Sequence, residues 1–255
     1  MDSRFLLPRL VAVGLLSAGL VRAESVHDTY AETHPLDPRG LVRIDDTNGS
    51  VEIRTWDRPE VSLQVEKRAS TEEYLREIQV TVESDPQSLS IRTVLPHHLL
   101  SWLWHGGGEG SVNLVLTVPA SVDLKKVALV NGPVSIAGVR GRVEARTVNG
   151  ALQVTGLESD AELTTVNGAI HLEVAALASG GHLHLTTING AIAVRLPASA
   201  NATVDATTIN GGVECALPIR LTDEGGRHSL HGIIGTGGAS LSATTVNGGI
   251  RLDPI

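Results

Sequence analysis

Residues 164–170 read TTVNGAI, and close copies of this stretch recur along the second half of the chain. The Asn-Gly pair at its centre begins at Asn48, Asn131, Asn149, Asn167, Asn189, Asn210 and Asn247. From the second of these onward, the intervals are 18, 18, 22, 21 and 37 residues. Repeats of this length are typical of proteins that stack one small structural unit on the next. The last interval is close to twice the others and predicts a degenerate unit at residues 231–240.

Each copy of the motif lies between two stretches in which apolar and polar residues alternate. Around Asn167, the apolar side of this alternation carries Ala161, Leu163, Thr165, Ile170, Leu172 and Val174. A period of two residues is the signature of a strand with one buried face. Each unit is therefore predicted to be a strand, a tight turn and a second strand. Cys215 is the only cysteine and falls on the apolar side, so we expect an inert buried thiol and no disulfide.

Two all-β folds are compatible with such units. The first is an antiparallel meander of hairpins, because Asn-Gly between alternating strands is a strong hairpin signal. The second is a parallel β-solenoid with coils of about 18–22 residues, and three features favour it. Pro133 follows an Asn-Gly pair at a position where a hairpin needs an N–H donor. The residue after Gly is always small or proline, as a crowded stacked corner requires, and helical segments that could cover a meander are scarce.

A stacked solenoid places the repeated residues of successive coils above one another, about 4.8 Å apart. We expect the corner asparagines to form a ladder of amide hydrogen bonds, with the members Asn131, Asn149, Asn167, Asn189, Asn210 and Asn247. A second ladder is predicted for the inward threonines of the same corner, of which Thr165 is one. Glycine is expected beside the asparagine because it adopts the positive φ that a tight corner needs.

The first residues of the chain predict export. They combine a basic start, an apolar stretch and a small-residue end at Ala23, as a cleaved secretory signal peptide does. No later stretch has the length of a spanning helix, so we expect no membrane span after cleavage and a periplasmic, cell-surface or extracellular location. The predicted organisation is a signal peptide at 1–23, a flexible mature N-terminus at 24–40, a β-rich N-terminal portion at 41–120 and the repeat solenoid at 121–255.

The N-terminal portion contains one early copy of the repeat and then changes character. Alternation in its later part predicts strands at 61–67, 78–82, 89–94 and 112–118. Ser70 and Glu73 fit a capping box and predict a short helix between the first two of these strands. Residues 118–124 are interpreted as a hinge into the solenoid, and the whole portion is expected to cover the first coil.

The chain carries no recognised catalytic or cofactor-binding motif, and a net charge of −8 lacks the basic footprint of a nucleic-acid-binding protein. We therefore predict a protein that is not an enzyme and has no catalytic, cofactor-binding or metal-binding residues. His182 and His184 share one strand face and would bind a metal only with an added carboxylate. The outward acids Glu144, Glu162 and Asp205 lie five residues before their asparagines, which leaves a polysaccharide-binding or -cleaving β-helix as the alternative function.

The stretch LPHHLLSWLWHGGGEG at 95–110 is the most unusual one outside the repeats, and it holds two of the three tryptophans. Clustered amphipathic aromatic residues dominate protein interfaces. We therefore predict a partner-docking patch made of Trp102, Trp104, Leu99 and Leu100. The alternative is that both tryptophans fill the N-terminal core. The expected partner is an envelope protein or a surface glycan.

Four stretches together resemble the bacterial "putative adhesin" family of β-strand-repeat proteins. They are DTNGSVEIRTWD (46–57), VNLVLTVPASVDL (112–124), the TxNG repeats (131–250) and GTGGASLSATTVNGGIRL (235–252). The resemblance covers most of the chain after the signal peptide and brings no catalytic motif with it. It implies a right-handed β-helix-like fold and an exported, non-catalytic protein.

Overall fold

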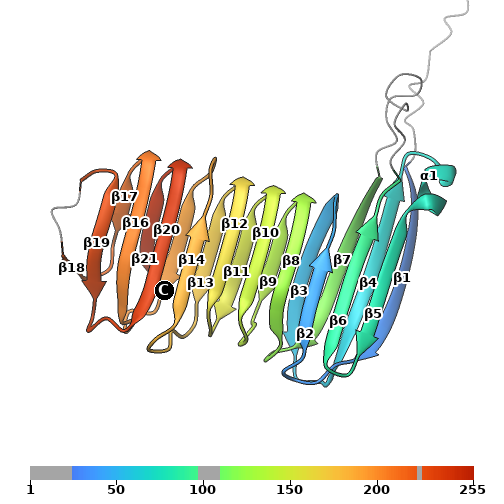
Figure 1. Ribbon diagram of the computed structural model, residues 1–255, viewed down its shortest axis with the longest axis horizontal. Coiled ribbons are helices and arrows are strands. Elements are labelled where there is room, and N and C mark those ends of the chain that lie inside the picture. The colour runs from blue at the N-terminus through green and yellow to red at the C-terminus, as the bar shows by residue number, and fades with distance from the viewer. Residues whose placement is uncertain (1–24, 97–109, 223–225) are drawn as a thin grey trace, which may run out of the picture.

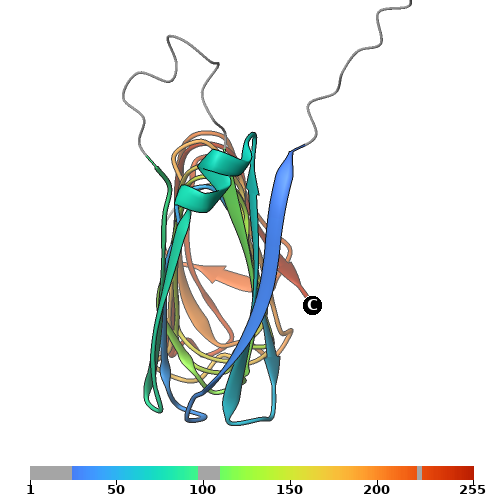
Figure 2. The same cartoon turned by 90° about the vertical axis from the view of Figure 1, so that its right-hand side faces the viewer.

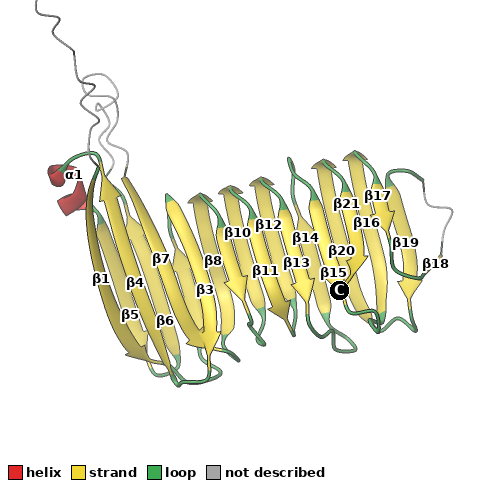
Figure 3. Cartoon of the chain, turned by 180° about the vertical axis from the view of Figure 1, so that it is seen from behind, coloured by secondary structure: helices red, strands yellow, loops and turns green. Residues whose placement is uncertain are grey.

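The computed structural model describes residues 25–96, 110–222 and 226–255. In this part of the chain, two long β-sheets lie face to face along an elongated body (Figures 1 and 3). Seen along the long axis, the sheets form two layers with one short helix at the N-terminal end (Figure 2). The N-terminal strands and the repeats belong to the same two sheets, so the solenoid is one continuous stack.

The ten-stranded sheet, called sheet A, has in spatial order β1 (Val26–Pro35), β4 (Glu60–Ala69), β7 (Gly110–Pro119), β3 (Gly49–Trp56), β9 (Val134–Ala137), β11 (Leu152–Leu157), β13 (Ile170–Val174), β15 (Ile192–Leu196), β21 (Ile250–Pro254) and β17 (Val213–Cys215). The eleven-stranded sheet, called sheet B, has β18 (Ile219–Leu221), β19 (Ser229–Ile234), β16 (Ala202–Asn210), β20 (Ala239–Asn247), β14 (His182–Thr186), β12 (Ala161–Asn167), β10 (Val143–Asn149), β8 (Asp123–Asn131), β2 (Leu41–Asp45), β6 (Ser88–Val94) and β5 (Gln79–Asp85).

Each Asn-Gly corner carries the chain from sheet B to sheet A. Thus β12 ends at Asn167 and β13 begins at Ile170, but the two strands lie in different sheets. Within each sheet the repeat strands pair in parallel, and β10 aligns with β12 so that Asn149 stands level with Asn167. Among the described strands, antiparallel pairs occur only near the two ends of the stack, among β1, β4 and β7, between β5 and β6, and around β19. The parallel solenoid is therefore confirmed, and the hairpin meander is wrong.

The coils do not stack in sequence order at the C-terminal end. Strand β20 pairs in parallel with β14 on one side and with β16 on the other, and β21 lies between β15 and β17 in the same way. The last coil, which turns at Asn247, is thus inserted between the coils of Asn189 and Asn210. The degenerate unit expected at 231–240 is wrong, because this region contains the end of β19, which runs antiparallel to β16, and the turn into β20. The corners share one consensus, so their order in space is not tied to their order in the chain.

The core between the sheets is a narrow column of aliphatic side chains, and polar groups enter it mainly at the corners. The inward threonines of the repeat are buried, and they are Thr147, Thr165, Thr187, Thr208 and Thr245. Each donates its hydroxyl hydrogen to a glycine carbonyl of the neighbouring coil, as Thr165 does to Gly150 over 3.0 Å. The predicted threonine row therefore exists, but its hydrogen bonds run to the backbone rather than from threonine to threonine.

The corner asparagines form an unbroken ladder along the upper edge of the molecule in Figure 1. Each Nδ2 donates to the Oδ1 of the adjacent coil over 2.6 to 2.8 Å, in the spatial order Asn48, Asn131, Asn149, Asn167, Asn189, Asn247 and Asn210. Although most of these side chains are exposed, a continuous chain of amide hydrogen bonds aligns successive coils, because a slip by one residue would break every rung. Asn48 extends the predicted ladder by one rung at its N-terminal end.

Corner glycines lie so close to the backbone of the neighbouring coil that a side chain would not fit. Only two of the corner glycines also have a backbone conformation that favours glycine. Gly49 and Gly132 have positive φ, whereas the corner glycines of the later coils do not. At Gly168, a Cβ atom would lie 1.9 Å from the carbonyl oxygen of Gly150 in the next coil. The expectation of positive φ throughout the ladder is therefore wrong, because the constraint is the close approach of stacked backbones.

The N-terminal portion differs from expectation in two places. Residues 24–40 are predicted to be flexible, but β1 occupies ten of them and pairs along its whole length with β4, whose backbone N–H and C=O groups would otherwise form a free sheet edge. Helix α1 (Glu72–Glu77) is capped by Thr71, which accepts a hydrogen bond from the Tyr74 N–H, rather than by Ser70. No helix in the described ranges has the length and apolar character to span a membrane.

Candidate functional site

The predicted docking residues Trp102, Trp104, Leu99 and Leu100 lie outside the described residues. The strands that flank their segment are described. It leaves β6 at Val94 and returns at Gly110 into β7, and Arg92 in β6 stands level with Asp45 in β2. The segment therefore connects sheet B to sheet A at the level where later coils make their Asn-Gly corner.

The histidines and acids identified from the sequence are distributed along the outer face of sheet B. The inserted coil changes their order, so that one row reads Glu144, Glu162, His184, Ser242 and Asp205. Strand β20 thus separates Asp205 from His184, and on its other side the Asp205 carboxylate lies 3.4 Å from Nδ1 of His231 in β19. Glu144 is already paired with Arg146 over 2.6 Å. Among the described residues, no three potential metal ligands come together.

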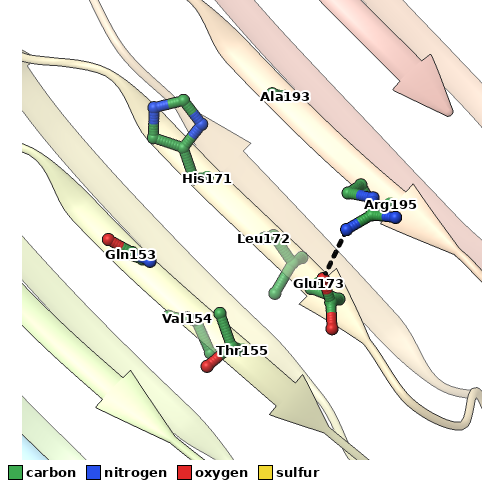
Figure 4. A pocket seen from close by; sticks show the side chains of 8 residues that line it. All are labelled: Gln153, Val154, Thr155, His171, Leu172, Glu173, Ala193 and Arg195. Carbon is green, nitrogen blue, oxygen red and sulfur yellow. Dashed lines mark hydrogen bonds and ion pairs between the residues drawn. The ribbon is translucent and has the colours of Figure 1, made fainter. Parts of the chain in front are cut away.

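A shallow hollow of about 370 Å³ lies on the outer face of sheet A, over β11, β13 and β15 (Figure 4). One row across it contains Gln153, His171 and Ala193, and the small alanine leaves the space. The next row holds Glu173, whose Oε2 accepts from Nη1 of Arg195 over 2.9 Å. A hollow with one carboxylate, and that one paired, has hydrogen-bonding groups for a ligand but not the two carboxyl groups of a glycoside hydrolase.

A second hollow of about 330 Å³ lies at the opposite edge from the asparagine ladder. It is formed where four turns meet, namely β1–β2, β3–β4, β7–β8 and β9–β10. Its wall includes the half-buried indole of Trp56 together with the exposed side chains of Arg58 and Arg140. We call it the Trp56 pocket. It combines an aromatic surface with charged groups that can orient a ligand, which is the usual composition of a binding site.

Sequence reasoning did not find the Trp56 pocket, because its lining residues come from turns that are far apart in the chain. The segment 118–124, interpreted as a hinge, is in fact the tight β7–β8 turn and supplies part of this wall. The one available signal was TWDRP at 55–59, an aromatic and a cation at the end of a predicted strand.

A buried carboxyl lies at the corner of the early repeat. Asp46 takes the place that the buried threonine has in later coils, two residues before the asparagine, and is 5% exposed. Its Oδ1 accepts hydrogen bonds from the Thr93 hydroxyl and from the Thr47 N–H, whereas Oδ2 has no partner among the described residues. Burial raises the pKa of this carboxyl from 3.8 to about 6, and the two hydrogen bonds oppose that rise.

Stability is expected to depend on pH through Asp46. Because its pKa is higher in the folded than in the unfolded state, the folded protein binds more protons between about pH 4 and 6. The free energy of unfolding should therefore fall by up to about 3 kcal/mol as the pH rises through this window. Asp46→Asn should remove this dependence and be more stable than wild type at pH 7.5 by about 2 kcal/mol in urea unfolding. The exposed control Asp28→Asn should keep the wild-type profile, and an unchanged profile for Asp46→Asn would contradict the assignment.

Comparison with known proteins agrees with the geometry. The Toastrack DUF4097 family model matches residues 120–253. A solved structure titled a "putative cell adhesion protein", from Clostridium sporogenes, has a TM-score of 0.51 and 12% identity, and the alignment covers 89% of this chain and all of that one. A "putative adhesin" from Bacteroides fragilis is 12% identical with a TM-score of 0.32, covering 88% and 97% of the two chains. No curated protein matches the chain.

At 12% identity, the Clostridium structure shows that the fold is shared and nothing more. The family match is stronger evidence, because it includes every Asn-Gly corner from Asn131 to Asn247. It also confirms the resemblance drawn from those repeats. Since the matched region spans more than half of the 255 residues, the chain belongs to the Toastrack DUF4097 family.

Proposed function

We propose that this protein is an exported, non-catalytic β-solenoid that acts as an adhesin or as an envelope interaction module. Its partner would be an envelope protein or a surface glycan, met in the periplasm or at the cell surface. The observation that carries the proposal is the division of roles within each coil. Inward and corner residues are used in stacking, whereas outward residues differ from coil to coil and line exposed hollows. Solenoids of this kind use their long outer faces for binding.

Two further features support this function. Residues 1–23 have the composition of a secretory signal peptide, which would deliver the protein across a membrane. The Clostridium sporogenes protein of the same fold is titled a "putative cell adhesion protein". Neither feature names a ligand, so the partner has to be found by capture.

The docking segment is the first place to test. Cross-linking capture from the native envelope with the mature wild-type protein as bait should recover a specific partner. The double variant Trp102→Ala/Trp104→Ala should recover it roughly tenfold less, since aromatic anchors contribute most of the binding energy in an interface. The matched control Val148→Ala/Ile188→Ala removes two exposed side chains from the corners and should capture like wild type. Equal recovery by a normally folded tryptophan double variant would refute the docking role.

A further inference from the structure

The Trp56 pocket has a rigid aromatic wall. The Trp56 Nε1–H donates to the Glu60 carbonyl over 2.8 Å, which holds the indole across the base of the β3–β4 turn. The Cζ atom of Arg58 lies 5.0 Å from the ring centroid, within the range of a cation–π contact. The indole is therefore fixed before any ligand arrives, and Pro119 and Ala120 extend its apolar surface on the neighbouring turn.

The two arginines of the pocket have the longest carboxylate contacts among the described arginines that pair with an acid. Arg58 lies 3.6 Å from Glu60, and Arg140 lies 3.7 Å from Glu158. In the other arginine–carboxylate pairs of the described residues the N–O separation is 2.5 to 3.0 Å, and those pairs involve Arg54, Arg68, Arg76, Arg146, Arg195 and Arg251. Guanidinium groups beyond hydrogen-bond distance of their acids keep their N–H donors available for an incoming anion.

We propose that the Trp56 pocket binds a carboxylated sugar, such as a uronic-acid residue of an acidic glycan. The sugar carboxylate would accept hydrogen bonds from Arg58 and Arg140, which suit the planar geometry of a carboxylate. The apolar face of the pyranose ring would lie on the indole and Pro119. The inference gives the exported binding module a ligand class and so rests on the proposed function.

The remaining lining residues favour a sugar over other anions. Asp57, Thr55 and Ser121 place a carboxylate and two hydroxyl groups around the pocket, and these can bind the hydroxyls of a sugar. The negative charge of Asp57 also disfavours a dianion such as phosphate more than it disfavours a monoanion. An acidic peptide would bind best by adding a strand, but β3 is already paired on both sides, by β7 and β9.

The test uses the mature chain with Trp102→Phe and Trp104→Phe, so that Trp56 is the only tryptophan and its emission reports on the pocket. Trigalacturonate should give a saturable change in emission, and its uncharged methyl ester should bind at least tenfold more weakly. Arg58→Gln and Arg140→Gln should each weaken binding about tenfold, as expected for the loss of one charge-assisted hydrogen bond. Arg146→Gln is the matched control, because this exposed arginine is already bound to Glu144 and lies outside the pocket, and it should bind within twofold of wild type.

Three results would overturn the proposal. They are no saturable binding of trigalacturonate, equal affinity for the methyl ester, and equal affinity for inorganic phosphate or triglutamate. Circular dichroism of each variant must match wild type, so that lost binding cannot come from lost structure. The capture experiment separates this inference from the broader function. If Arg58→Gln/Arg140→Gln still recovers the envelope partner, the interaction module stands. If, in addition, the protein with both arginines intact does not bind trigalacturonate, the pocket assignment fails on its own.

Discussion

Gly248→Ala should destabilise the protein by at least about 3 kcal/mol, which is the range of severe backbone and packing defects. A Cβ atom at Gly248 would lie 2.0 Å from the carbonyl oxygen of Gly190 in the adjacent coil. The atom that the new Cβ would meet belongs to the backbone and not to a flexible side chain, so the backbones of the two coils must move apart. That separation would weaken the hydrogen bonds that join these corners, including Gly190 N–H to Asn247 O over 3.0 Å. Urea unfolding followed by the β-sheet circular dichroism signal measures the loss.

The next residue provides a control of opposite sign. A Cβ atom at Gly249 would meet its nearest neighbour, the Gly212 oxygen, at 3.5 Å, an ordinary contact. The corresponding residues Ala151, Ala169 and Ala191 show that the corner accepts a methyl group at this position. Gly249→Ala should therefore be neutral or stabilise by up to about 1 kcal/mol, because it restricts the unfolded chain. Equal losses for the two variants would mean that close stacking is not the reason for the first glycine.

Ending the chain at Gly238 should shorten the solenoid by one coil and leave the rest folded. Removal of β20 and β21 takes away the inserted coil and exposes matching edges on either side. The strands on those edges, β14 and β16, carry the same TTING corner. We expect them to pair directly, with Asn210 beside Asn189, because that pairing restores the parallel hydrogen bonds and the asparagine ladder.

A disulfide reporter distinguishes the two arrangements in a Cys215→Ala background. In the full chain, Ile188 and Ile209 lie two strand spacings apart, about 9.6 Å, because the coil of Val246 stands between them. This is beyond the reach of a disulfide. Ile188→Cys/Ile209→Cys should therefore cross-link in the truncated chain and not in the full one, while Ile188→Cys/Val246→Cys should cross-link in the full chain. If the truncated chain gives no cross-link and residues 202–234 lose hydrogen-exchange protection, the terminal coil depends on the inserted strands.

The coil itself could be predicted from the sequence with good accuracy. The period-two alternation around Asn167 predicts that Leu163 and Ile170 face inward, and both are buried in the structure. Pro133 argues against hairpins, and the strands on either side of it lie in different sheets. Such features are local, because the side-chain pattern of one strand already reveals which face is buried. The reason for the corner glycine could not be obtained in this way. It depends on the distance between Gly168 and a carbonyl in another coil.

The candidate sites were harder to predict from the sequence than the coils of the solenoid. Asp46 could have been found by aligning DDTNGS with TTVNGA, which places the acid in the column of buried threonines. The Trp56 pocket had no comparable signal. Trp56 and Arg140 are 84 positions apart in the chain and meet only because two turns stack at one edge. The docking role of Trp102 and Trp104, by contrast, is a proposal that the capture experiment tests.

Local features of the sequence are enough to predict that this chain forms coils, because alternation, Asn-Gly corners and small neighbouring residues each act within about ten positions. The order in which those coils stack is set by contacts between distant parts of the chain. The corners of Asn189, Asn210 and Asn247 are nearly interchangeable, so local pattern cannot choose which two become neighbours. The choice depends on the connections that follow, since β19 turns back along β16 and leaves the place between β14 and β16 for β20. The stacking order also determines which turns come together at the edge opposite the asparagine ladder, and therefore where a binding pocket can form.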